Sequence, residues 1–439
     1  MIVPYWLERA ARARPDGEAL VCGKRTLTHR ELFDDAAAAA RELLGRGAAP
    51  GERVAIALPG GVEFVAALHG CMLAGLVAVP IDLRLGEAER GSLVAGCELI
   101  VDEPLEGAPG SWEPGAGHEL ESVAVLMHTS GTSAAPKPVP LTYGNLLWSA
   151  LGSAVALGLD AHERWLCALP LTHVGGLSIL VRSAIYATTT VLHPRFETDR
   201  VRHALQGGEA TVVSLVATTL SRLLDAGLER PAALRAALTG GGPVPEGLRE
   251  RAAAAGVPIA LTYGLTEAAS QVTTTPAAAM SSGAARGGPP LFCTTVAISD
   301  EGEILVSGPT VSHSALAEDG WLHTGDLGSI DDEGNLSVTG RAAETIISGG
   351  ENVAPTEVEA VLERHPAVVE AGVFAAEDEE WGEMVCARVV VLTGTVSADE
   401  LRAHCAQNLA GFKVPKRIDL TSEPLPRTVS GKLLRRELG

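Results

Sequence analysis

Strand-like and helix-like segments alternate along the N-terminal two thirds of the chain, and this alternation limits the possible folds more than any other feature. A buried strand pattern at 53–58 precedes a helix pattern at 62–74 and a second strand pattern at 77–81. The alternation continues with β-branched segments at 188–192 and 211–216. Repeated strand–helix–strand units imply parallel sheets that are covered by helices on both faces. We therefore expect an α/β protein.

The last third of the chain follows different patterns. At 439 residues the chain is too long for one ordinary core. Short strand patterns with Asp/Gly turns at 292–338 predict a small antiparallel or barrel-like unit. We expect a large N-terminal domain of parallel and mixed sheets over 1–339, which includes this β unit. A small α+β domain would follow from about residue 340 to the end of the given sequence.

Composition excludes several classes of partner. With 34 Lys and Arg against 54 Asp and Glu, the net charge of −20 would repel nucleic acid and anionic membranes. No apolar run has the length of a membrane span, and no secretion signal is visible, so we expect a cytoplasmic protein. Seven scattered cysteines without CxxC spacing speak against a disulfide framework and a zinc site. The sequence leaves the oligomeric state open, a homodimer included.

A hydroxyl-rich loop follows the strand pattern at 123–127. Backbone amides, hydroxyls and one ammonium group can together surround a polyphosphate. The loop is not a P-loop, because Pro136 stands where the second glycine belongs and Pro138 replaces the Ser/Thr that would hold magnesium. A Ser/Thr-rich surface turn is the alternative. The candidate residues of the loop are Thr129, Ser130, Gly131, Thr132 and Lys137.

Two carboxylates follow glycines at the ends of strand patterns. Glu267 can project into a cleft and carry Mg²⁺, which prefers hard oxygen ligands shared with phosphate, while Thr266 beside it can bond a phosphate oxygen. Capping of a helix start is the alternative for both. Asp326, in a Gly-Asp turn, can accept both hydroxyls of a ribose; an ordinary turn aspartate is the alternative. Gly241 lies in a glycine turn at a strand end, where open α/β sheets bind ligands.

Six fragments, in the order in which they occur along the chain, resemble the adenylate-forming superfamily of acyl-CoA synthetases, luciferases and peptide-synthetase adenylation domains. The resemblance covers nearly the whole chain and implies ATP, Mg²⁺ and coenzyme A as cofactors and co-substrates. Each fragment alone is weak, but six in order are specific. They are Thr129-Ser130-Gly131-Thr132 with Pro136-Lys137, Tyr263-Gly264-Leu265-Thr266-Glu267, Trp321 to Gly325-Asp326, Gly340-Arg341, Ser348-Gly349-Gly350 to Glu357, and Pro426 to Gly431-Lys432.

The resemblance implies roles for individual residues in a two-step reaction. A carboxylate attacks the α-phosphate of ATP to give acyl-AMP and pyrophosphate. A mobile small domain over 344–439, which carries the catalytic lysine, then rotates about a hinge at 340–343, and a thiol attacks the acyl-AMP. Lys432 would bind the carboxylate and the α-phosphate, His173 would act as a gate, and Thr266 and Glu267 would assist catalysis. The ATP-binding residues would be Thr129, Ser130, Gly131, Thr132, Lys137, Gly241, Tyr263, Gly264, Asp326 and Arg341. Ser348, Gly349 and Gly350 would line the pantetheine tunnel. Ala343 and the segment Ser133-Ala134-Ala135 depart from the usual pattern.

The segments 169–182, 191–196 and 261–273 resemble those of 2-succinylbenzoate–CoA ligases of menaquinone biosynthesis. The second carboxylate of that acid needs a cation or several donors. Arg182 and Arg195 are the candidate cations. Ser270 and Gln271 would add donors, and Gly242 would leave room for a flat ring.

Plainer interpretations compete with these assignments. Arg182 could pair with a surface acid, and His173 could be a packed histidine. The alternative functions are a CoA ligase for another aryl or medium-chain acid, a stand-alone adenylation enzyme that loads a carrier protein, and a nucleotide-binding relative without turnover.

Overall fold

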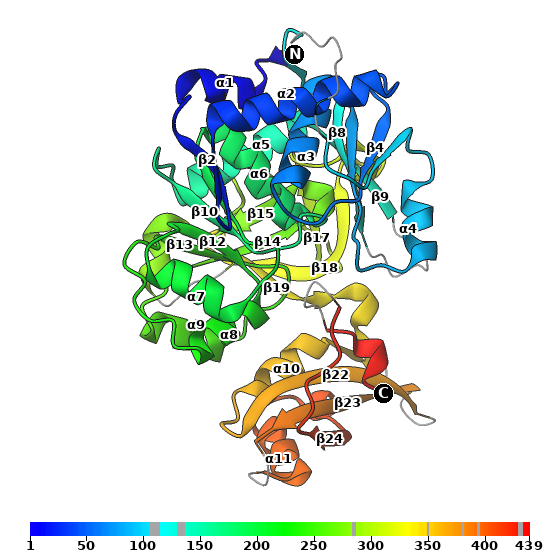
Figure 1. Ribbon diagram of the computed structural model, residues 1–439. Coiled ribbons are helices and arrows are strands. Elements are labelled where there is room, and N and C mark those ends of the chain that lie inside the picture. The colour runs from blue at the N-terminus through cyan, green and yellow to red at the C-terminus, as the bar shows by residue number, and fades with distance from the viewer. Residues whose placement is uncertain are drawn as a thin grey trace.

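The computed structural model describes residues 1–105, 107, 115–129, 137–282, 287–348, 351–378, 382–392, 396–428 and 433–439. Figure 1 shows a large body built from the N-terminal and middle parts of the chain, and a smaller body below it that carries the C-terminus. None of the helices in the described ranges is long and apolar enough to cross a membrane.

The largest sheet has eight strands in the order β15-β14-β13-β12-β10-β11-β2-β3. The strands from β14 to β2 in this order run parallel, and the edge strands β15 and β3 are antiparallel to their neighbours. The alternation in the sequence thus predicted the parallel sheet. The strands are β2 (Glu18–Cys22), β3 (Arg25–Thr28), β10 (Arg164–Cys167), β11 (Thr189–Leu192), β12 (Val212–Leu215), β13 (Ala236–Thr239), β14 (Ile259–Leu265) and β15 (Ser270–Thr274).

A second, five-stranded sheet has the order β6-β4-β5-β8-β9. Its edge strand β9 was not expected from the sequence, because Pro138 and Pro140 cannot donate to a ladder; prolines are tolerated at such an edge. The residues 102–121 are rich in Gly, Pro and Glu and predict a solvated linker. The structure instead places a short β7, paired with β1, in this stretch. The strands are β1 (Ile2–Val3), β4 (Arg53–Ile56), β5 (Val77–Pro80), β6 (Leu99–Val101), β7 (His118–Glu119), β8 (Val123–Thr129) and β9 (Lys137–Thr142).

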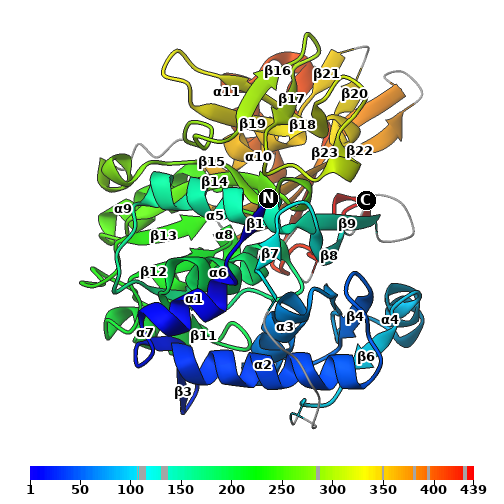
Figure 2. The ribbon, with the colours of Figure 1, turned by 90° about the horizontal axis from the view of Figure 1, so that it is seen from above.

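The helices of the large body cover these sheets. The sequence Thr28-His29-Arg30-Glu31 predicts a capping box at a helix start. α2 begins there, and Thr28 Oγ1 accepts from the Glu31 amide at 3.2 Å. α2 packs along α3, which covers β4 and β5 (Figure 2). The helices are α1 (Trp6–Ala13), α2 (His29–Gly45), α3 (Val62–Ala74), α4 (Glu87–Val94), α5 (Tyr143–Leu157), α6 (Val174–Tyr186), α7 (Thr198–Gln206), α8 (Ala217–Asp225) and α9 (Glu246–Ala254).

A four-stranded antiparallel sheet forms the expected small β unit, in the order β16-β17-β18-β19. Buried side chains of β17 and β18 pack against the loop that follows β14 and against β15. This packing fixes the antiparallel sheet beside the eight-stranded sheet. The strands are β16 (Thr295–Ile298), β17 (Glu303–Ser307), β18 (Leu322–Ile330) and β19 (Leu336–Arg341).

The C-terminal part has its own core between a sheet and two helices. β23 lies beside β20, β22 and β24. The hinge that we proposed at 340–343 falls where β19 ends and the 3₁₀ turn Ala342–Glu344 begins. The elements are β20 (Ile346–Ser348), β21 (Glu351–Val353), α10 (Pro355–Glu363), β22 (Val368–Asp378), β23 (Gly382–Val391), α11 (Ala398–Asn408) and β24 (Arg417–Thr421).

Candidate active site

The glycine turn after β13 lies at the carboxyl end of the parallel strands. Gly240 packs so closely on β14 that an added Cβ would lie 2.6 Å from the Thr262 carbonyl oxygen. Gly241 has a φ of +79°, which favours glycine. An added Cβ at Gly242 would meet no other atom within 4 Å, so space remains beside the turn. This edge of an open α/β sheet is where ligands bind.

A tight reversal between β14 and β15 carries the predicted magnesium ligand. A Cβ at Gly264 would lie 1.7 Å from the Ser270 carbonyl oxygen, so only glycine fits there. Thr266 and Glu267 are half-buried in a 3₁₀ turn, and the Glu267 carbonyl accepts from the Ser312 amide at 2.7 Å. Ser270 follows with a φ of 105°, an unusual conformation for a residue with a Cβ.

The residues around Glu267 fit a magnesium ion that is shared with phosphate. The described part of the chain holds no group of three or more His, Cys, Asp and Glu side chains that could bind a metal ion by itself. Mg²⁺ is commonly held by one or two carboxylates together with substrate phosphates and water. A single half-buried carboxylate at the edge of the sheet is compatible with that donor set.

Asp326 brings three predicted nucleotide-binding residues together. Its Oδ2 accepts from the Tyr263 hydroxyl at 2.8 Å, and its Oδ1 accepts from Arg341 Nε at 2.8 Å. Asp326 is only 6% exposed. Burial and then the negative charge of Asp326 raise the pKa of Tyr263, which therefore stays a donor. Each carboxylate oxygen has a further lone pair that can accept from a ribose hydroxyl.

The hydroxyl-rich loop is described only at its two ends. Thr129 and Lys137 pair across β8 and β9, and Thr129 Oγ1 donates to the Lys137 carbonyl oxygen at 3.4 Å. Lys137 is exposed, so its ammonium group is accessible to a ligand. The other residues predicted for the loop, the tunnel and the catalytic lysine lie outside the described residues; they are Ser130, Gly131, Thr132, Gly349, Gly350 and Lys432.

Arg182 on α6 is a buried cation that is only 2% exposed. Its Nη2 donates to Ser149 Oγ at 3.2 Å, and its guanidinium lies 5.5 Å from the centre of a Trp165 ring. No ion pair joins Arg182 to an acid within the described residues, and its burial does not fit pairing with a surface acid. Burial lowers the pKa of Arg182 to about 10. An uncompensated buried charge is costly, and a ligand carboxylate would offset that cost.

Ser149 links this cation to the reversal that carries Glu267. Its hydroxyl accepts from Arg182 and donates to the Ala269 carbonyl oxygen at 2.6 Å. Ala269 has a φ of 52° and stands directly before Ser270. This link could not be predicted from the sequence, because a buried serine in an apolar helix has no distinctive pattern.

The remaining candidates for acid binding differ in their surroundings. Gln271 is 1% exposed; its Nε2 donates to Thr274 Oγ1 at 2.7 Å, and its Oε1 has no hydrogen-bond partner among the described residues. Arg195 has an 83% exposed side chain and pairs with Glu197 at 2.5 Å. The structure therefore does not place Arg195 in a buried pocket, and we do not retain it as a partner of the acid.

His173 and Ser348 are less exposed than their predicted roles would suggest. His173 precedes α6, and burial followed by the charge of Arg84 lowers its pKa, so the ring is neutral near pH 7. Ser348 is 1% exposed, and its hydroxyl has no hydrogen-bond partner within the described residues. The gate and tunnel roles of these two residues stay predictions.

Sequence comparison identifies two protein families along the chain. The AMP-binding enzyme family matches residues 7–101 and 99–314. The C-terminal domain family of AMP-binding enzymes matches residues 357–432. Together these matches cover most of the chain in the expected order.

Individual relatives match the chain over almost its full length. The 2-succinylbenzoate–CoA ligase of Bacillus subtilis is 39% identical, and the alignment covers 99% of this chain and 97% of that protein. The 2-succinylbenzoate–CoA ligase of Bacillus licheniformis is 37% identical, with 99% of each chain covered.

Solved structures show the same similarity. The o-succinylbenzoate CoA synthetase of Bacillus subtilis in complex with the acyl-adenylate intermediate OSB-AMP has a TM-score of 0.91 at 38% identity, covering 100% of this chain and 98% of that one. The Bacillus subtilis synthetase in complex with ATP and magnesium ion has a TM-score of 0.91 at 38% identity, with 100% of both chains covered.

Proposed function

This chain belongs to the AMP-binding enzyme family, and on that premise we propose that it is an AMP-forming ligase that converts 2-succinylbenzoate to 2-succinylbenzoyl-CoA, a step of menaquinone biosynthesis. The observation that supports this acid most directly is Arg182, a buried cation without an acid partner among the described residues. The acid offers a second, unreacting carboxylate that such a cation would bind. Relatives of that name and nearly full coverage support the same assignment.

In the first step, the aliphatic carboxylate of the acid attacks the α-phosphorus of ATP. A bond forms between the carboxylate oxygen and phosphorus, the bond to the bridging oxygen breaks, and pyrophosphate leaves. Asp326, held by Tyr263 and Arg341, accepts the ribose hydroxyls and fixes the nucleoside. Glu267 would hold a magnesium ion, which neutralises phosphate charge when bound. Lys137 and Lys432 would add positive charge around the reacting anions.

In the second step, the thiol of coenzyme A releases its proton to water and its sulfur attacks the acyl carbon. A C–S bond forms, and AMP leaves with the electron pair of the broken C–O bond. Rotation of the C-terminal part about residues 340–343 would exchange the lysine segment for Ser348, Gly349 and Gly350 at the site.

We place the reaction in the cytoplasm. The seven free cysteines fit a reducing compartment of that kind.

The acid pocket would lie between Arg182 and the Ala269–Ser270 turn. Ser149 bonds to both, so one hydroxyl fixes the cation relative to the reversal that carries Glu267. Gln271 has an unpartnered buried oxygen among the described residues, and Ser270 has a half-buried hydroxyl side chain. A ligand carboxylate that reached Arg182 would compensate the charge of the guanidinium. The site would then prefer acids that carry a second carboxylate.

A matched pair of acids tests this proposal. 4-Oxo-4-phenylbutyrate has the same reacting chain as 2-succinylbenzoate but lacks the aromatic carboxylate. We expect kcat/KM for AMP formation, with ATP, Mg²⁺ and CoA, to be at least about a hundredfold higher for 2-succinylbenzoate, because a buried site built for a charged group rejects the analogue that lacks it. Equal values, or a higher value for benzoate or octanoate, would overturn the assignment of the acid. Acyl-AMP formation without consumption of free CoA would point to a carrier protein as the acceptor.

A further inference from the structure

A bulge in the four-stranded sheet determines the orientation of the Asp326 side chain. Leu305 of β17 pairs with His323 of β18, and Glu303 pairs with Leu327. Between these pairs β17 advances two residues (303 to 305), whereas β18 advances four (323 to 327). The extra residues, which include Asp326, leave the ladder between β17 and β18, while Asp326 still pairs with Arg341 of β19. Bulges of this kind redirect side chains next to functional sites.

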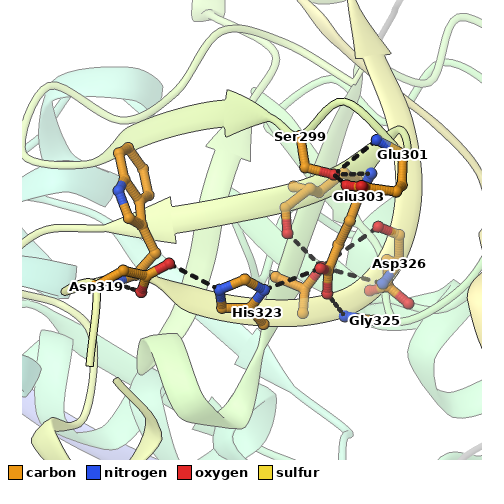
Figure 3. A network of polar contacts seen from close by, with 10 residues as sticks. Ser299, Glu301, Glu303, Asp319, His323, Gly325 and Asp326 are labelled. Atoms are coloured by element: carbon orange, nitrogen blue, oxygen red, sulfur yellow. Dashed lines mark hydrogen bonds and ion pairs between the residues drawn. The ribbon is translucent and has the colours of Figure 1, made fainter. Parts of the chain in front are cut away.

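Side chains satisfy the backbone amides of the bulge. Glu303 Oε1 accepts from the Gly325 amide at 2.8 Å, and Thr324 Oγ1 accepts from the Asp326 amide at 3.1 Å. Gly325 has a φ of +69°, a conformation that glycine adopts readily. The Glu303 carboxylate thus supplies the acceptor that the irregular ladder lacks, and it holds the residue directly before Asp326 (Figure 3).

His323 holds the other oxygen of the same carboxylate. Its Nδ1 lies 3.0 Å from Glu303 Oε2, and its Nε2 lies 3.0 Å from Asp319 Oδ2 (Figure 3). Ionised carboxylates only accept hydrogen bonds, so an imidazolium ring, with a proton on each nitrogen, donates to both of them. The hydrogen bonds that the ring donates to Asp319 and then to Glu303 raise the pKa of His323. The ring therefore locks the orientation of Glu303.

We propose that Glu303 and His323 are positioning residues for nucleotide binding, which act by fixing the Gly325–Asp326 bulge so that Asp326 meets the ribose hydroxyls. This inference rests on the proposed function, in which Asp326 accepts those hydroxyls. In this arrangement Glu303 and His323 act through Asp326 and not by bonding the nucleotide themselves. Their effect should therefore depend on the presence of the ribose hydroxyls.

Neighbouring Glu301 provides a matched control. It is the same residue type on the same hairpin, but its carboxylate accepts from Ser299 Oγ at 3.0 Å instead of from the bulge (Figure 3). Glu301→Ala therefore removes one carboxylate from the hairpin without removing the acceptor of the Gly325 amide. Glu303→Gln keeps a carbonyl oxygen at that place and serves as the conservative variant.

The test measures dissociation constants of ATP and of 2′,3′-dideoxy-ATP by calorimetry with the full chain. We expect Glu303→Ala to raise the dissociation constant of ATP about tenfold, the usual scale for losing one charge-assisted hydrogen bond. The dissociation constant of dideoxy-ATP should change by less than about twofold. His323→Gln should raise the dissociation constant of ATP about threefold and leave that of dideoxy-ATP nearly unchanged. Glu303→Gln keeps the acceptor of the Gly325 amide but loses the acceptor of His323 Nδ1, so it should weaken ATP binding about threefold, like His323→Gln. Glu301→Ala should bind both nucleotides like the wild type.

Three results would overturn the inference. Equal weakening of both nucleotides by Glu303→Ala would show general damage to the fold, and unchanged ATP binding in Glu303→Ala and His323→Gln would show that neither residue positions Asp326. A wild-type protein that binds ATP no tighter than dideoxy-ATP would remove the role of Asp326 on which the inference rests. Because the first two results leave wild-type ATP binding intact, they leave the proposed function standing; the third does not.

Discussion

The hydroxyl of Tyr263 donates to Asp326 Oδ2 at 2.8 Å, and this bond joins β14 of the eight-stranded sheet to β18 of the four-stranded sheet. Arg341, at the end of β19, bonds the other oxygen of the same carboxylate at 2.8 Å. Asp326 thus sits where two sheets and the start of the C-terminal part meet. A nucleoside bound to Asp326 would therefore lie at the junction of the two sheets and the C-terminal part.

Tyr263→Phe removes one of the two donors to Asp326 and leaves the ring in place. We expect KM for ATP to rise about tenfold, because a hydrogen bond to a charged group contributes about 1.5–3 kcal/mol, while kcat changes little. Initial rates of pyrophosphate release at varied ATP check this expectation. A comparable rise in KM for the acid would contradict it, since Tyr263 bonds the predicted ribose acceptor.

Arg182→Met replaces the buried cation by an apolar side chain of similar length. We expect kcat/KM for 2-succinylbenzoate to fall at least about thirtyfold and that for 4-oxo-4-phenylbutyrate to stay within about threefold, because only the first acid has a carboxylate for the cation. The free energy of unfolding should stay the same or rise by about 1 kcal/mol, since an uncompensated buried charge is removed.

Arg195→Met is the control for the Arg182 variant, because its side chain is 83% exposed and pairs with Glu197. It should leave kcat/KM for both acids and the free energy of unfolding unchanged. An Arg182→Met protein that loses activity toward both acids equally, together with stability, would show that Arg182 supports the fold and does not select the acid.

Arg435 ties the C-terminal tail to the rest of its domain. It bonds Glu344 beside the proposed hinge, and its Nη2 lies 2.8 Å from Glu359 Oε2 on α10. Because Lys432 lies three residues earlier in the sequence, we expect Arg435→Met to slow acyl-AMP formation about tenfold and to spare thioester formation from supplied acyl-AMP. Single-turnover rates of the two half-reactions check this.

Arg436→Met is the matched control for the tail, since Arg436 is exposed and adjacent. It should leave both half-reactions at the wild-type rate. Equal loss of both half-reactions in Arg435→Met would contradict a role confined to the lysine segment and would indicate unfolding of the C-terminal part.

Glu363 makes the stability of the C-terminal part depend on pH. Burial raises its pKa from 4.5 to about 7, although the Ala371 amide donates to it. A folded-state pKa above the unfolded value means that stability is greatest below about pH 4.5 and is lost as pH rises through about 7. Each pH unit in that window changes the free energy of unfolding by up to about 1.4 kcal/mol.

Glu363→Gln keeps the acceptor for the Ala371 amide and cannot ionise. Amide hydrogen exchange of α10 and β22 in the full chain, between pH 5 and 8 after correction for the intrinsic exchange rate, should show a flatter stability profile than the wild type. The exposed Glu437→Gln should reproduce the wild-type profile. A Glu363→Gln profile as steep as that of the wild type would assign the slope to other groups.

Local signals in the sequence predicted the parts of the structure that depend on neighbouring residues. The Thr28–Glu31 capping box and the helix at 62–74 were confirmed, because caps and apolar runs act within a few residues. β9 was missed because its prolines hide a strand that is stable only at an edge. The sheet between 292 and 338 was expected as an antiparallel unit, since its turns are explicit in the sequence.

The candidate site shows where sequence reasoning stops. Asp326 stood out because its glycine precedes it directly, but the Glu303 carboxylate that holds Gly325 is 22 residues away. Arg182 and Ser149 are 33 residues apart, on different helices. Arg182 and Arg195 are the same residue type near one another in the chain, and only the packing of α6 makes one a buried cation and leaves the other in solvent.

The exchange of labelled pyrophosphate into ATP without coenzyme A tests the central claim most directly, because it reports reversible acyl-AMP formation alone. We predict rapid exchange that requires 2-succinylbenzoate and Mg²⁺ and that is lost in Lys432→Ala while ATP binding persists. A wild-type protein that shows no exchange with 2-succinylbenzoate or any other acid would contradict the account.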